Sequence, residues 1–205
     1  MTEQQVSRKR AKQAPTQSPG QVSSDSKEQA ATDAGQDSGI VTSIEISKDY
    51  LHFSSAHFTI FSETEREDLH GHTFYVTATV RTEVGDNGLA FDYNLLKSKL
   101  KALCDQLDEK VLLPERSPHL HIRYERLLDN TQYLIATFNG EQLPFLPRDV
   151  LLLPVRNIAV EELAPWFLAG LQTDEQIKAL DLIELLVRVS SGPGQWAGAT
   201  WNRTR

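Results

Sequence analysis

The sequence is poor in several features that mark other classes of protein. It has one cysteine among 205 residues, so it cannot form an internal disulfide, and this fits a reducing compartment such as the cytoplasm. No apolar run is long enough to span a bilayer. Acidic residues outnumber basic ones by 28 to 21, and the net charge of -7 argues against a nucleic-acid-binding surface. We therefore expect a cytoplasmic protein that acts on neither membranes nor nucleic acids.

Aromatic residues are missing from the first 40 positions, which are dominated by small and polar side chains. A segment of this composition cannot bury enough apolar surface to offset the entropy of ordering it. Residues 1–41 are therefore predicted to be a disordered tail. It has no apolar segment typical of a secretory signal. The hydrophobic content of 40% suffices for a core, so residues 42–205 are predicted to form one domain.

Three histidines stand on strand-like segments. The segment HGHTFYVTATV alternates, and side chains two residues apart on a strand share a face, so His70 and His72 begin an apolar row that continues with Phe74. His57 ends FSSAHF, a second strand-like segment, and a neighbouring strand can bring it to the same point. Three neutral imidazoles with an open fourth position are typical of a catalytic zinc site, so Zn²⁺ is the predicted cofactor. The alternative is three scattered histidines that pack or face solvent.

The remaining histidines are weaker ligand candidates. His52 lies on the opposite face of its strand from His57. His119 and His121 form a second His-x-His pair, but their face also carries charged side chains, so we predict a solvated strand there. Gly71, between the paired histidines, is interpreted as a position where another group comes close.

Hydrophobic periodicity outlines the other elements. Residues 42–61 are predicted to form one long strand, and a second strand spans about 72–83 and ends at a turn cluster. The stretch 89–113 has helical spacing, with Asp92 as N-cap. The rest of the chain is predicted to contain strand-like 119–138, a hairpin turn at Asn139-Gly140, a helix in VEELAPWFLAGL with Pro165 in its first turn, and a final strand, DLIELLVRVSS. The order predicts an α+β fold: an antiparallel sheet with two helices packed on one face.

The motifs FSSAHF, LHGHTFYV, GLAFDYNLLKSKL and LDEKVLLP, with a final VxV strand, resemble the 6-pyruvoyl- and 6-carboxytetrahydropterin synthase family. The resemblance covers residues 45–114 and, loosely, 157–200. It implies the T-fold, in which subunits join into trimers and usually hexamers. It also implies a zinc ion on His57, His70 and His72, and a small-molecule pterin substrate, 7,8-dihydroneopterin triphosphate.

The catalytic residues that the resemblance implies depart from the usual pattern. The family commonly uses a cysteine shortly before the paired histidines as its base, and none stands here. Glu67, three residues before His70, resembles a variant branch with E-x-x-H, so Glu67 is the candidate base; the alternative is a solvated loop carboxylate. Asp108 matches the aspartate of the family's LDH motif, but Glu109 replaces the histidine and is either a proton carrier or a surface residue.

The expected substrate contacts depart as well. Ser190 and Ser191 stand where the family places a glutamate that grips the pterin ring, and serines hydrogen-bond it only weakly. Residues 116–154 resemble an insertion longer than the typical enzyme has. By resemblance the activity is that of a 6-carboxy-5,6,7,8-tetrahydropterin synthase, a lyase on the route to queuosine-type bases. The alternatives are cleavage to 6-hydroxymethyl-dihydropterin for folate and a non-catalytic zinc-binding relative.

Overall fold

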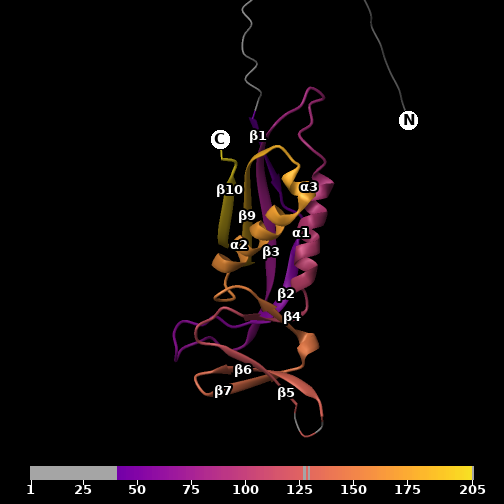
Figure 1. Cartoon of the computed structure of the whole chain (residues 1–205). Helices are drawn as coiled ribbons and strands as arrows, with labels where there is room; N and C mark the ends of the chain where they lie inside the picture. Colours follow the sequence, from indigo (N-terminus) through magenta and orange to yellow (C-terminus); the bar gives the residue numbers. More distant parts are fainter. Residues whose placement is uncertain (1–40, 127, 129, 205) are drawn as a thin grey trace, which may run out of the picture. The chain divides into compact units, whose positions relative to one another are not determined.

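A computed structural model describes residues 41–126, 128 and 130–204, which cover the predicted domain except for residues 127, 129 and 205 (Figure 1). The predicted tail lies, except for its last residue, outside the described residues and stays a prediction. Within the described part of the chain, no helix is long and apolar enough to cross a membrane.

A seven-stranded, mostly antiparallel sheet forms the centre of the domain. Its strands run in the order β10-β9-β3-β2-β4-β8, and β1 pairs with the second half of β3. Only the pairs β2–β4 and β4–β8 are parallel. The strands are β1 (Val41–Ile46), β2 (His52–His57), β3 (His70–Glu83), β4 (Lys110–Pro114), β8 (Val150–Leu153), β9 (Leu182–Gly192) and β10 (Gln195–Asn202).

Two predictions about these strands were wrong. The single strand expected over 42–61 is two strands, because the chain turns after β1, where the Leu51 amide donates to the Lys48 carbonyl. The two strands pair with different halves of β3. The strand predicted to be the last is followed by β10, which a turn with Gly194 at φ 81° joins to β9. The apolar row predicted on β3 is confirmed, since Phe74 and every second residue from Val76 to Val80 are buried.

Helices cover one face of this sheet, as predicted (Figure 1). They are α1 (Tyr93–Leu107), α2 (Val160–Thr173) and the short α3 (Glu175–Lys178). Asp92 caps α1 as expected, because its side chain accepts a hydrogen bond from the Asn94 amide. Helix α1 ends earlier than the periodicity over 89–113 indicates, and the chain continues as strand β4. Leu96, Leu100 and Leu107 of α1 are fully buried in the core between helices and sheet.

Pro165 lies deeper in its helix than expected. It is the sixth residue of α2, in the second turn, and it removes the amide that would otherwise bond to the Glu161 carbonyl. Helix α2 nevertheless persists, because its buried face packs into the core with Leu163 and Phe167 fully enclosed. Tertiary packing therefore outweighs the local cost of the proline.

The stretch between β4 and β8 forms a second, smaller antiparallel sheet, which we call the small sheet. It consists of β5 (His121–Arg126), β6 (Gln132–Phe138) and β7 (Glu141–Phe145), followed by the 3-10 turn η1 (Pro147–Asp149). The predicted hairpin turn is confirmed, with Asn139 and Gly140 both at positive φ between β6 and β7. His121 is exposed and His119 is partly exposed, and neither belongs to a metal-competent group among the described residues, in agreement with a solvated strand.

Candidate metal and substrate site

Neighbouring strands bring the three predicted histidines together. His57 at the end of β2 pairs with His70 at the start of β3, and His72 follows on the same face. Their nitrogen atoms lie within 4.8 Å of one another, and the Nε2 atoms of His70 and His72 are 3.0 Å apart. A tetrahedral ion at about 2.0–2.1 Å from each nitrogen would hold them about 3.3 Å apart, so the spacing fits a metal ion such as zinc.

Main-chain carbonyls orient two of these rings. Nδ1 of His57 lies 2.9 Å from the Ile158 carbonyl, and Nδ1 of His70 lies 2.7 Å from the Asp68 carbonyl. A carbonyl oxygen can only accept a hydrogen bond, so the ring nitrogen that faces it must be the donor. We therefore assign the proton to Nδ1 in both rings, which leaves the Nε2 lone pairs free. The Nε2 of His57 is buried without a hydrogen-bond partner among the described residues. An unpaired buried acceptor beside two further imidazoles is what a metal ligand requires.

The surroundings of the His57 ring keep it neutral. Burial and the neighbouring His70 together lower the pKa of His57 to about 4, against the opposing effect of the hydrogen bond to the Ile158 carbonyl. Protonation would place a positive charge in a confined space beside two other imidazoles. His57 is therefore a neutral ligand over the whole physiological pH range.

Glu67 lies beside the histidines. Its Oε2 is 4.0 Å from Nε2 of His70 and accepts a hydrogen bond of 2.9 Å from the Thr59 amide. Partial burial raises the pKa of Glu67, but the Thr59 hydrogen bonds and the neighbouring His70 outweigh it, so the net shift is downward. The carboxylate is therefore ionised and able to accept a proton.

The three histidines and Glu67 line a pocket of about 340 Å³, within the range of small-molecule sites. Ser191 also lines it, whereas Ser190 is buried and accepts a hydrogen bond from the Gly192 amide; their contacts with a substrate stay predictions. Sequence reasoning missed other wall residues, which come from the start of α2 and from β10: Ala159, Val160, Glu161 and Gln195. The acidic pair at 161–162 could have drawn attention to Glu161, but nothing in the sequence placed it near the histidines.

Asp108 and Glu109 lie elsewhere. Neither belongs to the described residues that line the histidine pocket. The Asp108 carboxylate accepts a 2.7 Å hydrogen bond from the Ser54 amide, so it fixes the end of α1 to β2. Glu109 has φ 57°, a strained conformation for this residue, and lines a separate pocket of about 550 Å³ whose wall includes His72. Their catalytic roles remain predictions.

The close approach expected at Gly71 is not found. A Cβ atom added there would meet the Ser55 carbonyl oxygen at 3.5 Å, an ordinary contact. Gly71 instead lies on the wall of the Glu109 pocket. Within the described residues, the backbone does not require glycine at this position.

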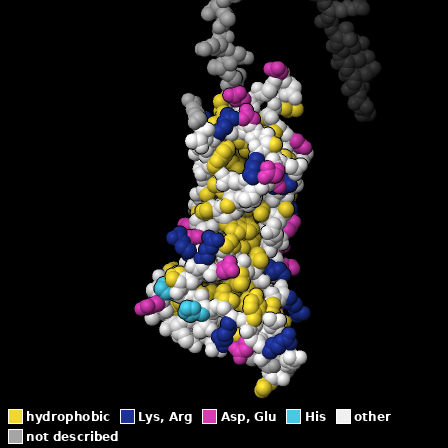
Figure 2. Space-filling view, viewed as in Figure 1, with side chains coloured by type: hydrophobic (Ala, Val, Ile, Leu, Met, Phe, Trp, Pro, Cys, Tyr) yellow, Lys and Arg dark blue, Asp and Glu magenta, His cyan; other side chains and the backbone are white. Residues whose placement is uncertain are grey.

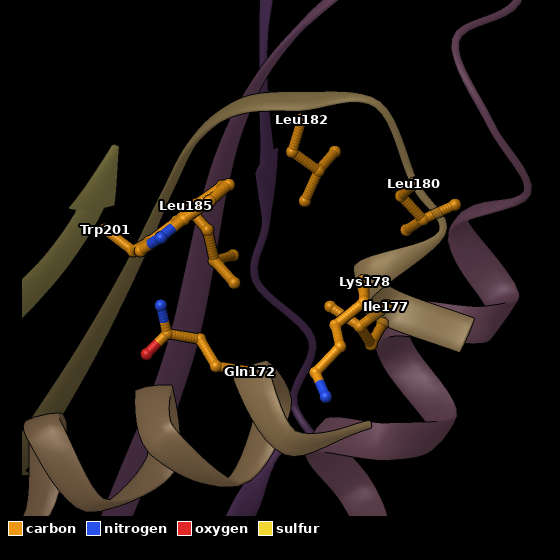
Figure 3. Close-up of a pocket in the computed structure, with 7 residues that line it drawn as sticks. All are labelled: Gln172, Ile177, Lys178, Leu180, Leu182, Leu185 and Trp201. Carbon is orange, nitrogen blue, oxygen red and sulfur yellow. The ribbon is translucent and has the colours of Figure 1, made fainter. Parts of the chain in front are cut away.

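A different cavity, of about 280 Å³, lies between the ends of α2 and α3 and strands β9 and β10 (Figure 3). Its walls are mainly apolar, with Leu182, Leu185 and Trp201 on the strands. The single cation on its wall, Lys178, already pairs with Glu175 at 2.7 Å. This cavity has no side chain suited to acid–base or metal chemistry, so the histidine pocket is the candidate site.

Comparison with known proteins agrees with this site. The sequence pattern of the 6-pyruvoyl tetrahydropterin synthase family matches residues 45–200. A protein of Methanocaldococcus jannaschii, provisionally named 6-carboxy-5,6,7,8-tetrahydropterin synthase, is 32% identical over 155 residues, 75% of this chain and 90% of the relative. A Pyrococcus abyssi protein with the same provisional name is 28% identical over 151 residues, 72% of this chain and 85% of the relative.

Solved structures show the same fold. The 6-pyruvoyl tetrahydropterin synthase of Plasmodium vivax matches with a TM-score of 0.72 and 27% identity, over 80% of this chain and 99% of that one. The Plasmodium falciparum protein matches with a TM-score of 0.70 over the same shares. Two further Plasmodium vivax structures carry alanine or cysteine in place of a glutamate described as a catalytic residue.

The fold and the pocket define an α+β domain with three converging imidazoles at one end of its sheet. The chain belongs to the 6-pyruvoyl tetrahydropterin synthase family, a family of lyase-type pterin synthases with the T-fold. The predicted family and fold class are both confirmed.

Proposed function

We propose that this protein is a zinc-dependent lyase that converts 7,8-dihydroneopterin triphosphate, with the activity of a 6-carboxy-5,6,7,8-tetrahydropterin synthase. The observation that carries the proposal is the convergence of His57, His70 and His72 with the Glu67 carboxylate in one pocket. The provisional names of the archaeal relatives support this product class. A reducing, cytoplasmic location is compatible with the single, buried cysteine.

In this mechanism each group has one task. His57, His70 and His72 hold the ion, which supplies a Lewis acid for the hydroxyl oxygens of the substrate side chain. The Glu67 carboxylate takes a proton from a side-chain carbon or hydroxyl beside it. The Thr59 amide, which donates to Oε2 at 2.9 Å, stabilises the charge on Glu67 before the transfer.

The pterin ring would be recognised by the pocket wall that α2, β9 and β10 form. A pterin presents an amino group and a ring N–H, which a carboxylate binds more strongly than a hydroxyl does. Glu161 at the start of α2 supplies such a carboxylate, and Ser191 and Gln195 supply further polar groups. Glu161 can therefore replace the ring-gripping glutamate, since serines stand at positions 190 and 191 of β9.

A second candidate is cleavage of the same substrate to 6-hydroxymethyl-dihydropterin. The observation that favours it is the glutamate that stands in place of the usual cysteine, at a position suited to a base. The glutamate described as catalytic in the Plasmodium vivax protein supports a glutamate base in this fold. The two products differ in mass, so one assay distinguishes them.

The decisive experiment is turnover of 7,8-dihydroneopterin triphosphate with and without a chelator, with products identified by mass spectrometry. We expect loss of substrate that stops on chelation and returns on addition of zinc. Glu67→Gln should abolish turnover while zinc remains bound, and the exposed His52→Ala serves as the matched control. Bound zinc without turnover in the wild-type protein would favour the non-catalytic relative.

The family assembly is proposed for this chain as well. Among the described strands, β1 pairs only with β3 and β10 only with β9, so each leaves one edge open. Both edges carry exposed apolar side chains, Val41 at 43% and Trp196 at 47%. Hydrophobic side chains also lie along the visible surface of the domain (Figure 2). Pairing of such edges between copies would give a homo-oligomer, a trimer or hexamer.

A further inference from the structure

Arg66, the residue before Glu67, is partly buried although it belongs to a surface loop. Its side chain is 14% exposed. The guanidinium carbon lies 5.0 Å from the ring centre of Phe58 and 5.7 Å from that of Phe138. Phe58 follows β2, whereas Phe138 ends β6 of the small sheet. The guanidinium therefore lies between the loop that carries Glu67 and the small sheet.

Hydrogen bonds extend the same connection. Nη1 of Arg66 donates to the main-chain carbonyl of Glu67 at 2.7 Å, and Nη2 donates to Oε2 of Glu141 at 2.8 Å. Glu141 is the first residue of β7, so the anchor is the hairpin between β6 and β7. The main chain adds an isolated bridge between Ile60 and Arg66 and a bond from the Glu67 amide to the Thr59 carbonyl.

Stability alone does not explain this arginine. Its Nε is buried with no hydrogen-bond partner among the described residues, so part of the guanidinium has lost its hydration without replacement. The partner carboxylate of Glu141 is 65% exposed, and ion pairs at the surface contribute little. An apolar side chain of similar length could fill the space between the two rings without that desolvation cost.

We propose that Arg66 is a positioning residue for Glu67, and that the β6–β7 hairpin is the anchor to which it ties the candidate base. The Arg66 guanidinium holds the Glu67 carbonyl, and the Thr59 amide holds the Glu67 carboxylate. Together they set the carboxylate 4.0 Å from His70. The small sheet, which contributes no wall residue to the histidine pocket, thereby supports its geometry. The proposal rests on the role of Glu67 proposed above.

The test is Arg66→Met, which keeps an unbranched side chain and removes all donors. We expect kcat to fall about 10–100-fold, because small displacements of a reacting group are costly, while KM changes less than about twofold. Zinc content and melting temperature should stay those of the wild-type protein. Arg123→Met is the matched control, since this arginine is 46% exposed and pairs with Glu125 on the same small sheet; its kcat should not change.

Hydrogen exchange gives a readout that does not depend on activity. The Glu67 amide should exchange faster in Arg66→Met, whereas the amides of β3 should exchange as in the wild-type protein. If the wild-type protein shows no turnover, the proposed function fails, but faster exchange at Glu67 still supports the tether.

Unchanged kcat and unchanged exchange at Glu67 would overturn the proposal. Loss of zinc together with a general rise in exchange would also overturn it, because Arg66 would then be a purely structural residue. If Arg66→Met does not fold, Glu141→Ala removes only the exposed partner, with its charge and its acceptor oxygens. That variant should lower kcat by a smaller factor than the one expected for Arg66→Met, with KM and zinc content unchanged. An unchanged kcat would contradict the role of the β6–β7 hairpin as the anchor.

Discussion

The Nε2 atom of His57 is the single atom that argues most directly for a metal. It is buried and unpaired among the described residues, while Nδ1 of the same ring meets a carbonyl. A buried polar atom without a partner costs about 1–3 kcal/mol. Binding of an ion removes that cost and uses the neighbouring rings of His70 and His72 as well. This argument rests on packing and hydrogen bonding, independently of any similarity to other proteins.

Removal of any one of the three ligands should therefore release the metal. We expect His57→Ala, His70→Ala and His72→Ala each to lose nearly all bound zinc, because two imidazoles cannot hold it against solvent. Metal content of the purified variants, measured by mass spectrometry, checks this. His52→Ala, on the exposed face of the same strand, should keep its zinc. Full zinc content in all three variants would refute the ligand assignment.

Cys104 should be inert. It is fully buried in α1, and burial raises the pKa of its thiol to about 12. Only the thiolate is a nucleophile, so we expect almost no labelling by a disulfide reagent at pH 8 in the folded protein and complete labelling after denaturation. Rapid labelling of the native protein would contradict the buried position.

The same shift gives a direction for the pH dependence of stability. The unfolded thiol loses its proton above about pH 8.5, while the folded one keeps it until about pH 12. The native state then binds more protons, so the free energy of unfolding from Cys104 falls as the pH rises between these values. Cys104→Ala should weaken this fall in denaturant titrations at pH 8 and 10.

At the scale of elements, the site depends on one connection between distant segments. The Asn157 side chain, just before α2, donates to the Ile60 carbonyl at 2.8 Å and accepts from the Ile60 amide at 3.1 Å. It also accepts from the Ile158 amide, next to the carbonyl that orients His57. Asn157 therefore holds the segment before α2 against the end of β2.

Loss of this connection should affect metal binding more than folding. We expect Asn157→Ala to lower zinc affinity about 10–100-fold, because partners that orient a ligand have effects of that size. Competition with a chelator of known affinity measures it. Asn94→Ala, at an exposed position of α1, is the matched control. Equal affinity in both variants would show that the Ile158 carbonyl is held without Asn157.

At the scale of the whole molecule, open edges decide whether the chain acts alone. The sides of β1 and β10 that pair with no other described strand predict a homo-oligomer. If folding and assembly are coupled, the melting temperature should rise with protein concentration, by mass action. Light scattering coupled to size exclusion gives the mass directly. A monomeric mass with a concentration-independent melting temperature would contradict the assembly.

The sequence by itself determined the elements with strong periodicity. Strand β3 and helix α1 could be predicted as elements, because each local pattern allows one buried face. The patterns are the alternation after His70 and the spacing of Leu96, Leu100 and Leu107. The sequence also placed the histidines of β2 and β3 on one face. The turn before His52 and strand β10 were not predicted. Their local sequence signals are weak, and pairing with distant strands determines them instead.

Only the tertiary structure decided which distant groups share the pocket. Glu161 and Gln195 reach the histidines because α2 and β10 pack against the sheet there, and no local pattern encodes that meeting. The same holds for Arg66, whose partners Phe138 and Glu141 lie more than seventy positions away. Side-chain chemistry marks the candidates for a site along the chain. Long-range packing selects among them, because it depends on contacts that no short segment contains.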